Sequence, residues 1–168
     1  MGACSPCSII FHVLSLLQVG LAVAICIIVG VKLQDVSFNS DNLTFSYSCL
    51  LGSDYGSSSL CTYTYAVAGI SLAVSALVSL VQCCTCNLCG LGKIIDVILA
   101  AFGTAWWAIA SGVIASNVSD TITGVDPAAV ASVQSWRDAI PIMCYVETGL
   151  FAGMFVSGLF RCCSCCRG

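Results

Sequence analysis

Charged side chains are scarce in this sequence. Only 8% of the 168 residues are Asp, Glu, Lys or Arg, whereas 59% are hydrophobic, and the mean hydropathy is +1.03. In ordinary soluble domains about a quarter of the residues are charged, so the composition excludes that class. With only five Lys and Arg residues and no basic stripe, a nucleic-acid-binding surface is excluded as well.

Catalytic groups are also few. The sequence has a single histidine, His12, and its serines and cysteines fall in no recognised catalytic motif. The sequence therefore offers no set of nucleophile, base and acid that could form a catalytic site. We expect a non-enzymatic protein without a cofactor.

What the sequence does have is long apolar runs, over residues 8–32, 63–82, 92–116 and 139–160. Each is at or near the length of about 20 residues that crosses a bilayer as an α-helix. Backbone groups in lipid must be hydrogen-bonded within the segment, which favours helices. The sequence predicts an all-α membrane protein, one four-transmembrane-helix bundle over residues 1–168 with short loops. The first run lacks the basic leader and cleavage site of a signal peptide, so we expect it to be an uncleaved span.

Four spans put residues 1–7, 83–91 and 161–168 on one side and the polar loops 33–62 and 117–138 on the other. The glycosylation sequons at Asn42 and Asn117 both fall in the polar loops, with Cys49 and Cys61. Glycans and disulfides belong to extracellular or lumenal compartments. We therefore expect cytosolic termini in a multi-pass protein of the plasma membrane or an endomembrane or vesicle. Asn42 is the favoured glycan acceptor, because Asn117 follows the third span too closely.

The two polar loops carry local structural signals. Leu43–Tyr47 alternates apolar and polar residues, which indicates a short strand or extended segment. We expect a disulfide between Cys49 and Cys61, since an exposed lumenal loop seldom keeps free thiols. In the second loop, Asp126 followed by Pro127 is typical of the cap and first position of a short helix.

Most of the 14 cysteines lie beside the spans on the terminal side. Juxtamembrane cysteines are sites of S-acylation, and palmitoylation is the favoured interpretation. The alternative is zinc, since Cys86-x-x-Cys89 and Cys163-x-x-Cys166 have a ligand spacing. Cys26 and Cys144 lie inside spans, where they are expected to be small hydrophobic side chains. The candidate acylation sites are Cys4, Cys7, Cys83, Cys84, Cys86, Cys89, Cys162, Cys163, Cys165 and Cys166.

Several polar side chains fall inside the apolar runs, where they are costly unless partnered. His12 and Asp96 both lie about one helical turn inside the terminal side, so we expect them to pair between the first and third helices. Gln18 and Glu147 lie deeper, within reach of Thr104 or Tyr145.

Small residues recur at helical spacing in three of the runs, and such rows allow helices to approach closely. The third run was expected to be the centre of the bundle for this reason. The rows are Ala66, Gly69, Ala73 and Ala76; Ala101, Ala105, Ala108 and Gly112; and Gly149, Gly153 and Ser157.

These residues together resemble MARVEL-type tetraspans, in particular the Casparian-strip-membrane-protein-like branch. The matching positions are Ile9–His12, with His12 in place of an Arg, Ala66–Ser71, Ile94–Asp96 and the alanine-rich segment 100–115. Trp136 matches a Trp of the second loop in that family, whereas the family's cysteine pair in that loop is missing here. Synaptogyrin-like vesicle proteins share the layout and are the nearest rival.

The resemblance implies a scaffold that associates laterally, with itself or with partner membrane proteins, and organises a membrane domain. Rows of small residues on three helices agree with this interpretation. Two alternatives stay open: a channel or transporter subunit that uses His12, Gln18, Asp96 and Glu147, and a vesicle-trafficking tetraspan. The expected partners are the lipid bilayer and other membrane proteins, in a homo- or hetero-oligomer.

Overall fold

The computed structural model describes residues 6–40, 43–52, 59–84, 91–118 and 127–165. Within these ranges the chain forms four long helices and one small antiparallel sheet. The helices are α1 (Pro6–Ile28), α2 (Ser59–Cys84), α3 (Leu91–Val118) and α4 (Pro127–Cys165). A π-helical turn, η1 (Val29–Leu33), continues α1.

Each of the four helices contains a stretch long and apolar enough to cross a membrane, which confirms the predicted helical architecture. These stretches are His12–Leu33, Ser59–Leu77, Ile94–Val118 and Ala131–Phe160. Large apolar side chains cover their outer surfaces, including Leu16, Ile98 and Ile109. Such a surface would drive aggregation in water but is well solvated by lipid tails. The fold is therefore compatible with a multi-pass membrane protein.

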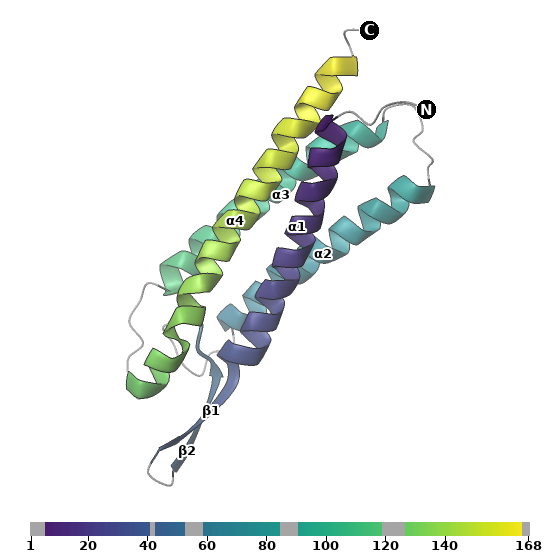
Figure 1. Cartoon of the computed structure of the whole chain (residues 1–168). Coiled ribbons are helices and arrows are strands. Elements are labelled where there is room, and N and C mark those ends of the chain that lie inside the picture. The colour runs from purple at the N-terminus through teal and green to yellow at the C-terminus, as the bar shows by residue number, and fades with distance from the viewer. Residues whose placement is uncertain (1–5, 41–42, 53–58, 85–90, 119–126, 166–168) are drawn as a thin grey trace.

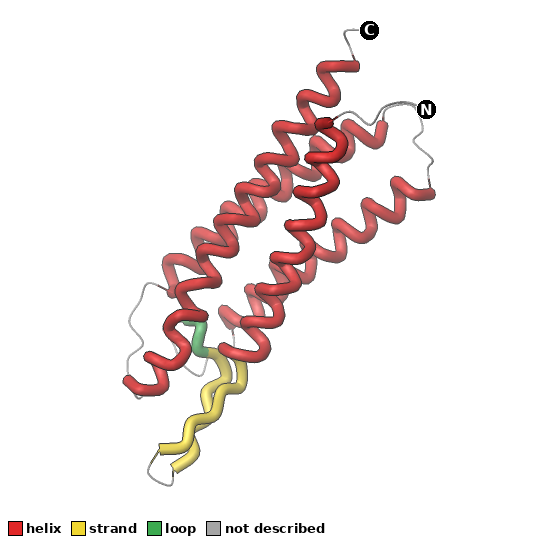
Figure 2. The backbone as a smooth tube through the Cα atoms, in the orientation of Figure 1, coloured by secondary structure: helices red, strands yellow, loops and turns green. Residues whose placement is uncertain are grey.

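The helices run alternately up and down. The start of α1 and the end of α4 lie at one end of the bundle, and the sheet lies at the other (Figures 1 and 2). Helix α4 packs against both α1 and α3, whereas α2 diverges from α1 toward the end where α1 begins (Figure 1). At the sheet end α2 approaches α1 closely, because Gly30 leaves room for the Tyr65 hydroxyl.

A β-hairpin projects from the end of α1 (Figure 2). Strand β1 (Gln34–Ser40) pairs with β2 (Leu43–Cys49), with Val36 opposite Tyr47. The expected extended segment is thus a full strand, and its partner β1 was not predicted. Asp35, at the junction of helix and strand, has a φ of 49°, a left-handed conformation that Asp tolerates better than most residues.

The second polar loop is shorter than predicted. A short helix capped at Asp126 and running to Ala131 was expected within the loop 117–138, but α4 is continuous from Pro127 to Cys165. The predicted start at Pro127 is confirmed. The helix continues through this region because residues 128–136 contain neither Gly nor Pro. In addition, Val133 and Arg137 are buried on the helix face that continues into the bundle.

The core takes buried residues from all four helices and extends to the sheet end. Helices α3 and α4 approach most closely at two glycines. A Cβ on Gly103 would collide with the ring of Phe151, and one on Gly158 would lie 2.8 Å from Val97 Cγ2. The largest fully buried side chain is Trp107 of α3.

Candidate functional site

A cavity of about 110 Å³ lies between the four helices. We call it the interhelical pocket. Its polar lining includes an amide, three hydroxyls and a carboxylate, and three aromatic side chains also line it. The lining residues are Ser15, Gln18, Ile70, Ser71, Val74, Ser75, Asp96, Leu99, Ala100, Phe102, Trp106, Phe151 and Met154.

Gln18 is the polar centre of this pocket. Its side chain is 2% exposed, and its Nε2 donates to Ser75 Oγ at 3.2 Å and to Ser71 Oγ at 3.4 Å. Ser71 also accepts a hydrogen bond from Trp107 Nε1 at 3.1 Å. These bonds join α1, α2 and α3 through buried groups, where an unmade hydrogen bond is costly. Within the described chain, the Gln18 side-chain oxygen accepts no hydrogen bond.

The predicted partners of Gln18 were wrong. Thr104 donates to the carbonyl of Ala100 in its own helix at 2.7 Å, and Tyr145 is 55% exposed on the outer surface. The small serines of α2 lie nearer to Gln18 because α1 packs against α2 at this depth. Serine hydroxyls spaced by four residues point to the same helix face, a signal present in the sequence.

Glu147 is buried on α4 with no exposed surface. Neither carboxylate oxygen has a hydrogen-bond partner among the described residues. The backbone of Ala22, one turn beyond Gln18 on α1, lies near this carboxyl. The expected bonds from Glu147 to Thr104 or Tyr145 are not formed. Glu147 does not line the interhelical pocket.

Asp96 and His12 occupy different environments. Asp96 is half-buried and lines the pocket, whereas His12 is exposed and does not. Their helices begin at the same end of the bundle (Figure 1). The His12–Asp96 pair stays a prediction. Of the four polar residues inside the spans, the pocket thus brings together Gln18 and Asp96.

The row of small residues on α3 points away from the bundle. Ala101, Ala105, Ala108 and Gly112 are all exposed, so the prediction that they form the packing face at the centre of the bundle was wrong. Trp107 fixes the rotation of α3, because its bulky ring and indole N–H need the interior and the Ser71 acceptor. The contact face of α3 instead uses Gly103, which the sequence analysis did not single out.

The small-residue rows on α2 and α4 differ in orientation. On α2 the whole row faces outward, with Ala66, Gly69, Ala73 and Ala76 exposed. On α4, Gly149 is exposed, but Gly153 faces α1, since a Cβ there would lie 3.4 Å from Leu14 Cδ1. Ser157 is half-buried, and its hydroxyl donates to Gly153 of its own helix at 2.9 Å.

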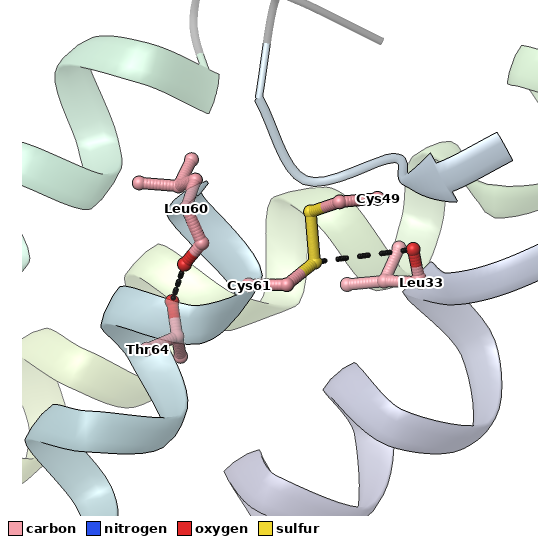
Figure 3. The surroundings of a disulfide bond; sticks show 5 residues. All are labelled: Leu33, Cys49, Leu60, Cys61 and Thr64. Atoms are coloured by element: carbon pink, nitrogen blue, oxygen red, sulfur yellow. Dashed lines mark hydrogen bonds between the residues drawn. A yellow bond between two sulfur atoms is a disulfide. The ribbon is translucent and has the colours of Figure 1, made fainter. Parts of the chain in front are cut away.

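The predicted disulfide between Cys49 and Cys61 is present, with a Cα–Cα distance of 6.0 Å. It joins the end of β2 to the first turn of α2 (Figure 3). The Cys61 sulfur lies 4.0 Å from the Leu33 carbonyl oxygen, which also accepts a hydrogen bond from the Leu50 amide at 2.8 Å. With Leu33, Leu50 and Leu51 fully buried, the bridge anchors the hairpin to an apolar base.

The sequence analysis missed Arg137, which is 2% exposed. Its guanidinium donates to Gln134 Oε1 at 3.1 Å and to the carbonyl oxygen of Val118 at 3.4 Å. Val118 ends α3, where a cation is favoured by the helix dipole. Beside it, Lys32 Nζ lies 5.8 Å from the ring centroid of Trp136, which ties η1 to α4 by a cation–π contact.

Several predicted sites lie outside what the structure describes. These are Asn42 and the side chains of the candidate acylation and zinc cysteines. Asn117 lies in the last turn of α3, and its amide donates to the carbonyl of Val113 at 2.8 Å. Cys26 is half-buried and Cys144 is buried. Among the described residues, no group of His, Cys, Asp and Glu is arranged to hold a metal ion.

Comparisons with protein-family models, curated proteins and solved structures found no match.

Proposed function

We propose that this protein is a non-enzymatic tetraspan scaffold that associates laterally in the membrane, with itself or with other membrane proteins. The observation that carries the proposal is the outward orientation of the small-residue rows on α2 and α3. The protein's own bundle leaves both rows uncovered, so a partner helix could approach the backbone of α2 or α3 closely there.

The energetics of helix association in lipid favour contacts at such rows. Lipid tails solvate apolar side chains as well as another helix does, so helices associate through close backbone packing rather than apolar burial. On α3 the row of Ala101, Ala105, Ala108 and Gly112 is flanked by exposed Phe102 and Ile109. A partner helix can therefore approach the backbone and pack its own side chains against these two.

The sequence resemblance to MARVEL-type, Casparian-strip-membrane-protein-like tetraspans supports the same function. Acylation of the juxtamembrane cysteines would add affinity for particular membrane domains, because each buried CH₂ contributes about 0.8 kcal/mol. Cytosolic termini and a glycan on Asn42 complete the proposed arrangement.

The distribution of polar groups favours a scaffold over a transport protein. A solute path needs its polar residues along one continuous cavity. Here Gln18 and Asp96 line the interhelical pocket, whereas His12 and Glu147 do not. The Gln18 amide is also committed to two hydroxyls of α2.

The test is the mass of the purified protein in mild detergent. We expect an assembly of several chains, alone or with a copurifying membrane protein. Ala105→Leu combined with Ala108→Leu should place bulky side chains on the α3 row and shift the protein to the monomer. Gly20→Leu is the matched control, because a Cβ on exposed Gly20 of α1 meets nothing within 4 Å. A monomer that conducts ions in liposomes would replace the scaffold by the transport interpretation.

A further inference from the structure

We propose that the interhelical pocket binds the head of a neutral, hydroxyl-bearing lipid, such as a diacylglycerol, that enters from the bilayer between α2 and α3. The lipid would place its glycerol hydroxyl against Gln18 and leave its acyl chains outside the bundle. This inference is independent of lateral association.

The polar lining fits a hydroxyl group. The Gln18 side chain is nearly fully buried and lines the pocket, and among the described residues its oxygen accepts no hydrogen bond. The hydroxyl of Ser75 lies 3.2 Å from the same amide. A ligand hydroxyl can donate to the amide oxygen, whereas a pure hydrocarbon would leave that oxygen unsatisfied.

The charge of the lining argues against an anionic head. Asp96 is the one ionisable group among the described lining residues, and none of them is basic. A phosphate placed here would meet this carboxylate at close range, and the lining itself supplies no cation. Ordinary phospholipids are therefore poor ligands for this pocket.

The size fits a head of few atoms. A volume of about 110 Å³ is somewhat smaller than the cavity of about 150 Å³ that accommodates benzene in another protein. It holds a glycerol-sized group but no bulky ring system or choline head. The remainder of the lipid must stay outside.

The pocket opens toward the surface that lipid would cover. Ile70 and Val74 of α2 and Phe102 of α3 line the pocket and are also exposed, at 48%, 37% and 60%. Phe102 and Trp106 stack with ring centroids 6.2 Å apart and planes at 19°, which forms a flat apolar wall. Acyl chains leaving the pocket would follow this wall between α2 and α3.

The test is photolabelling of the full chain in phosphatidylcholine liposomes. The probe is a diacylglycerol with a diazirine in the acyl chain near the glycerol, and phosphatidic acid with the same chains is the comparison lipid. We expect the diacylglycerol to label peptides of α2 and α3 around Val74 and Phe102. Unlabelled diacylglycerol should compete for this labelling, and the phosphatidic acid should label about tenfold less.

Three variants separate binding from folding. Val74→Trp should block the opening and reduce labelling about tenfold, whereas Leu77→Trp, on the same helix but outside the pocket, should leave it unchanged. Gln18→Leu should reduce labelling by a similar factor, the effect of about one lost hydrogen bond. Equal labelling by the two lipids, or labelling unaffected by Val74→Trp, would overturn the proposal. The proposal would also be overturned if unlabelled diacylglycerol did not reduce labelling of α2 and α3, which would mean that the pocket holds only water.

Discussion

At the scale of single residues, the buried carboxyl of Glu147 is unfavourable for the free energy of folding. Its carboxyl is fully buried, and both oxygens lack hydrogen-bond partners among the described residues. Burying a polar group without a partner costs about 1–3 kcal/mol in protein mutational series, and an ionised carboxylate costs more. A residue of this kind is unfavourable for stability alone, so we infer that it serves the protein in another way.

Replacing Glu147 should therefore stabilise the isolated protein. Glu147→Met keeps the volume and removes the unsatisfied oxygens, and we expect a gain of about 1–3 kcal/mol in the free energy of unfolding. Glu147→Gln should gain less, because the amide is still polar and unpartnered. Thermal unfolding in detergent measures both. A destabilised Met variant would show that a group outside the described residues holds the carboxyl.

The His12–Asp96 pair is tested by a double-mutant cycle. If the two side chains interact, His12→Ala and Asp96→Ala should each lower stability in detergent, and the double variant should lose less than the sum. Asp96→Asn should be milder than Asp96→Ala, because the amide can still hydrogen-bond the ring. His12→Arg should be tolerated, since it restores the basic residue of the family that this chain resembles. Strict additivity would mean that the residues do not interact.

At the scale of elements, helix packing depends on glycines that leave room for a neighbour. Gly103→Ala would drive a methyl group into the Phe151 ring, and overpacking of this kind costs about 1–3 kcal/mol. Gly20→Ala makes the same chemical change in open space, so it should be neutral or stabilise by up to about 1 kcal/mol. Unfolding midpoints of the two variants compare them directly. Equal effects would show that α3 and α4 do not meet at Gly103.

The hairpin depends on its covalent anchor. Cys49 and Cys61 are separated by 12 residues, and the chain-entropy treatment gives about 3 kcal/mol for a bridge that closes a loop of this size. Cys49→Ser with Cys61→Ser should lower the free energy of unfolding by about this amount. Peptide mapping without reductant should first find the two residues linked in the untreated protein. Free alkylation of both thiols would refute the bridge.

Much of the architecture follows from the sequence because its signals are strong and local. Runs of apolar residues predicted the four helices, alternation in Leu43–Tyr47 predicted β2, and compartment chemistry predicted the disulfide. Which face of a helix points inward was harder to predict. On α3, small residues lie both in the row that includes Ala105 and at Gly103, so the sequence offers two candidate packing faces. The buried Trp107 decides between these faces, and its acceptor Ser71 lies 36 residues away in the chain. The pairing of Gln18 with Ser71 and Ser75 likewise depends on which helices are neighbours.

At the scale of the whole molecule, the bundle divides into a tight part and an open part. Helix α4 packs along both α1 and α3, while α2 diverges from α1 away from the sheet end (Figure 1). The disulfide and the buried Leu33, Leu50 and Leu51 hold α2 at that end. The interhelical pocket lies between the four helices, and the small-residue rows on α2 and α3 face outward. An assembly that covers these rows would complete the packing that one chain leaves unfinished.

The central claim, lateral association through the outward small-residue rows, is tested most directly by energy transfer between copies in liposomes. Chains labelled with donor or acceptor are mixed, and transfer is followed as the protein-to-lipid ratio falls. We expect wild type and Gly20→Leu to keep energy transfer at high dilution in lipid. The double variant Ala105→Leu with Ala108→Leu should lose transfer at protein-to-lipid ratios at least about tenfold higher. A loss of about 1.4 kcal/mol in the free energy of association lowers the association constant tenfold. Identical dilution curves for the three proteins, or no transfer in wild type, would contradict association of copies through the α3 row.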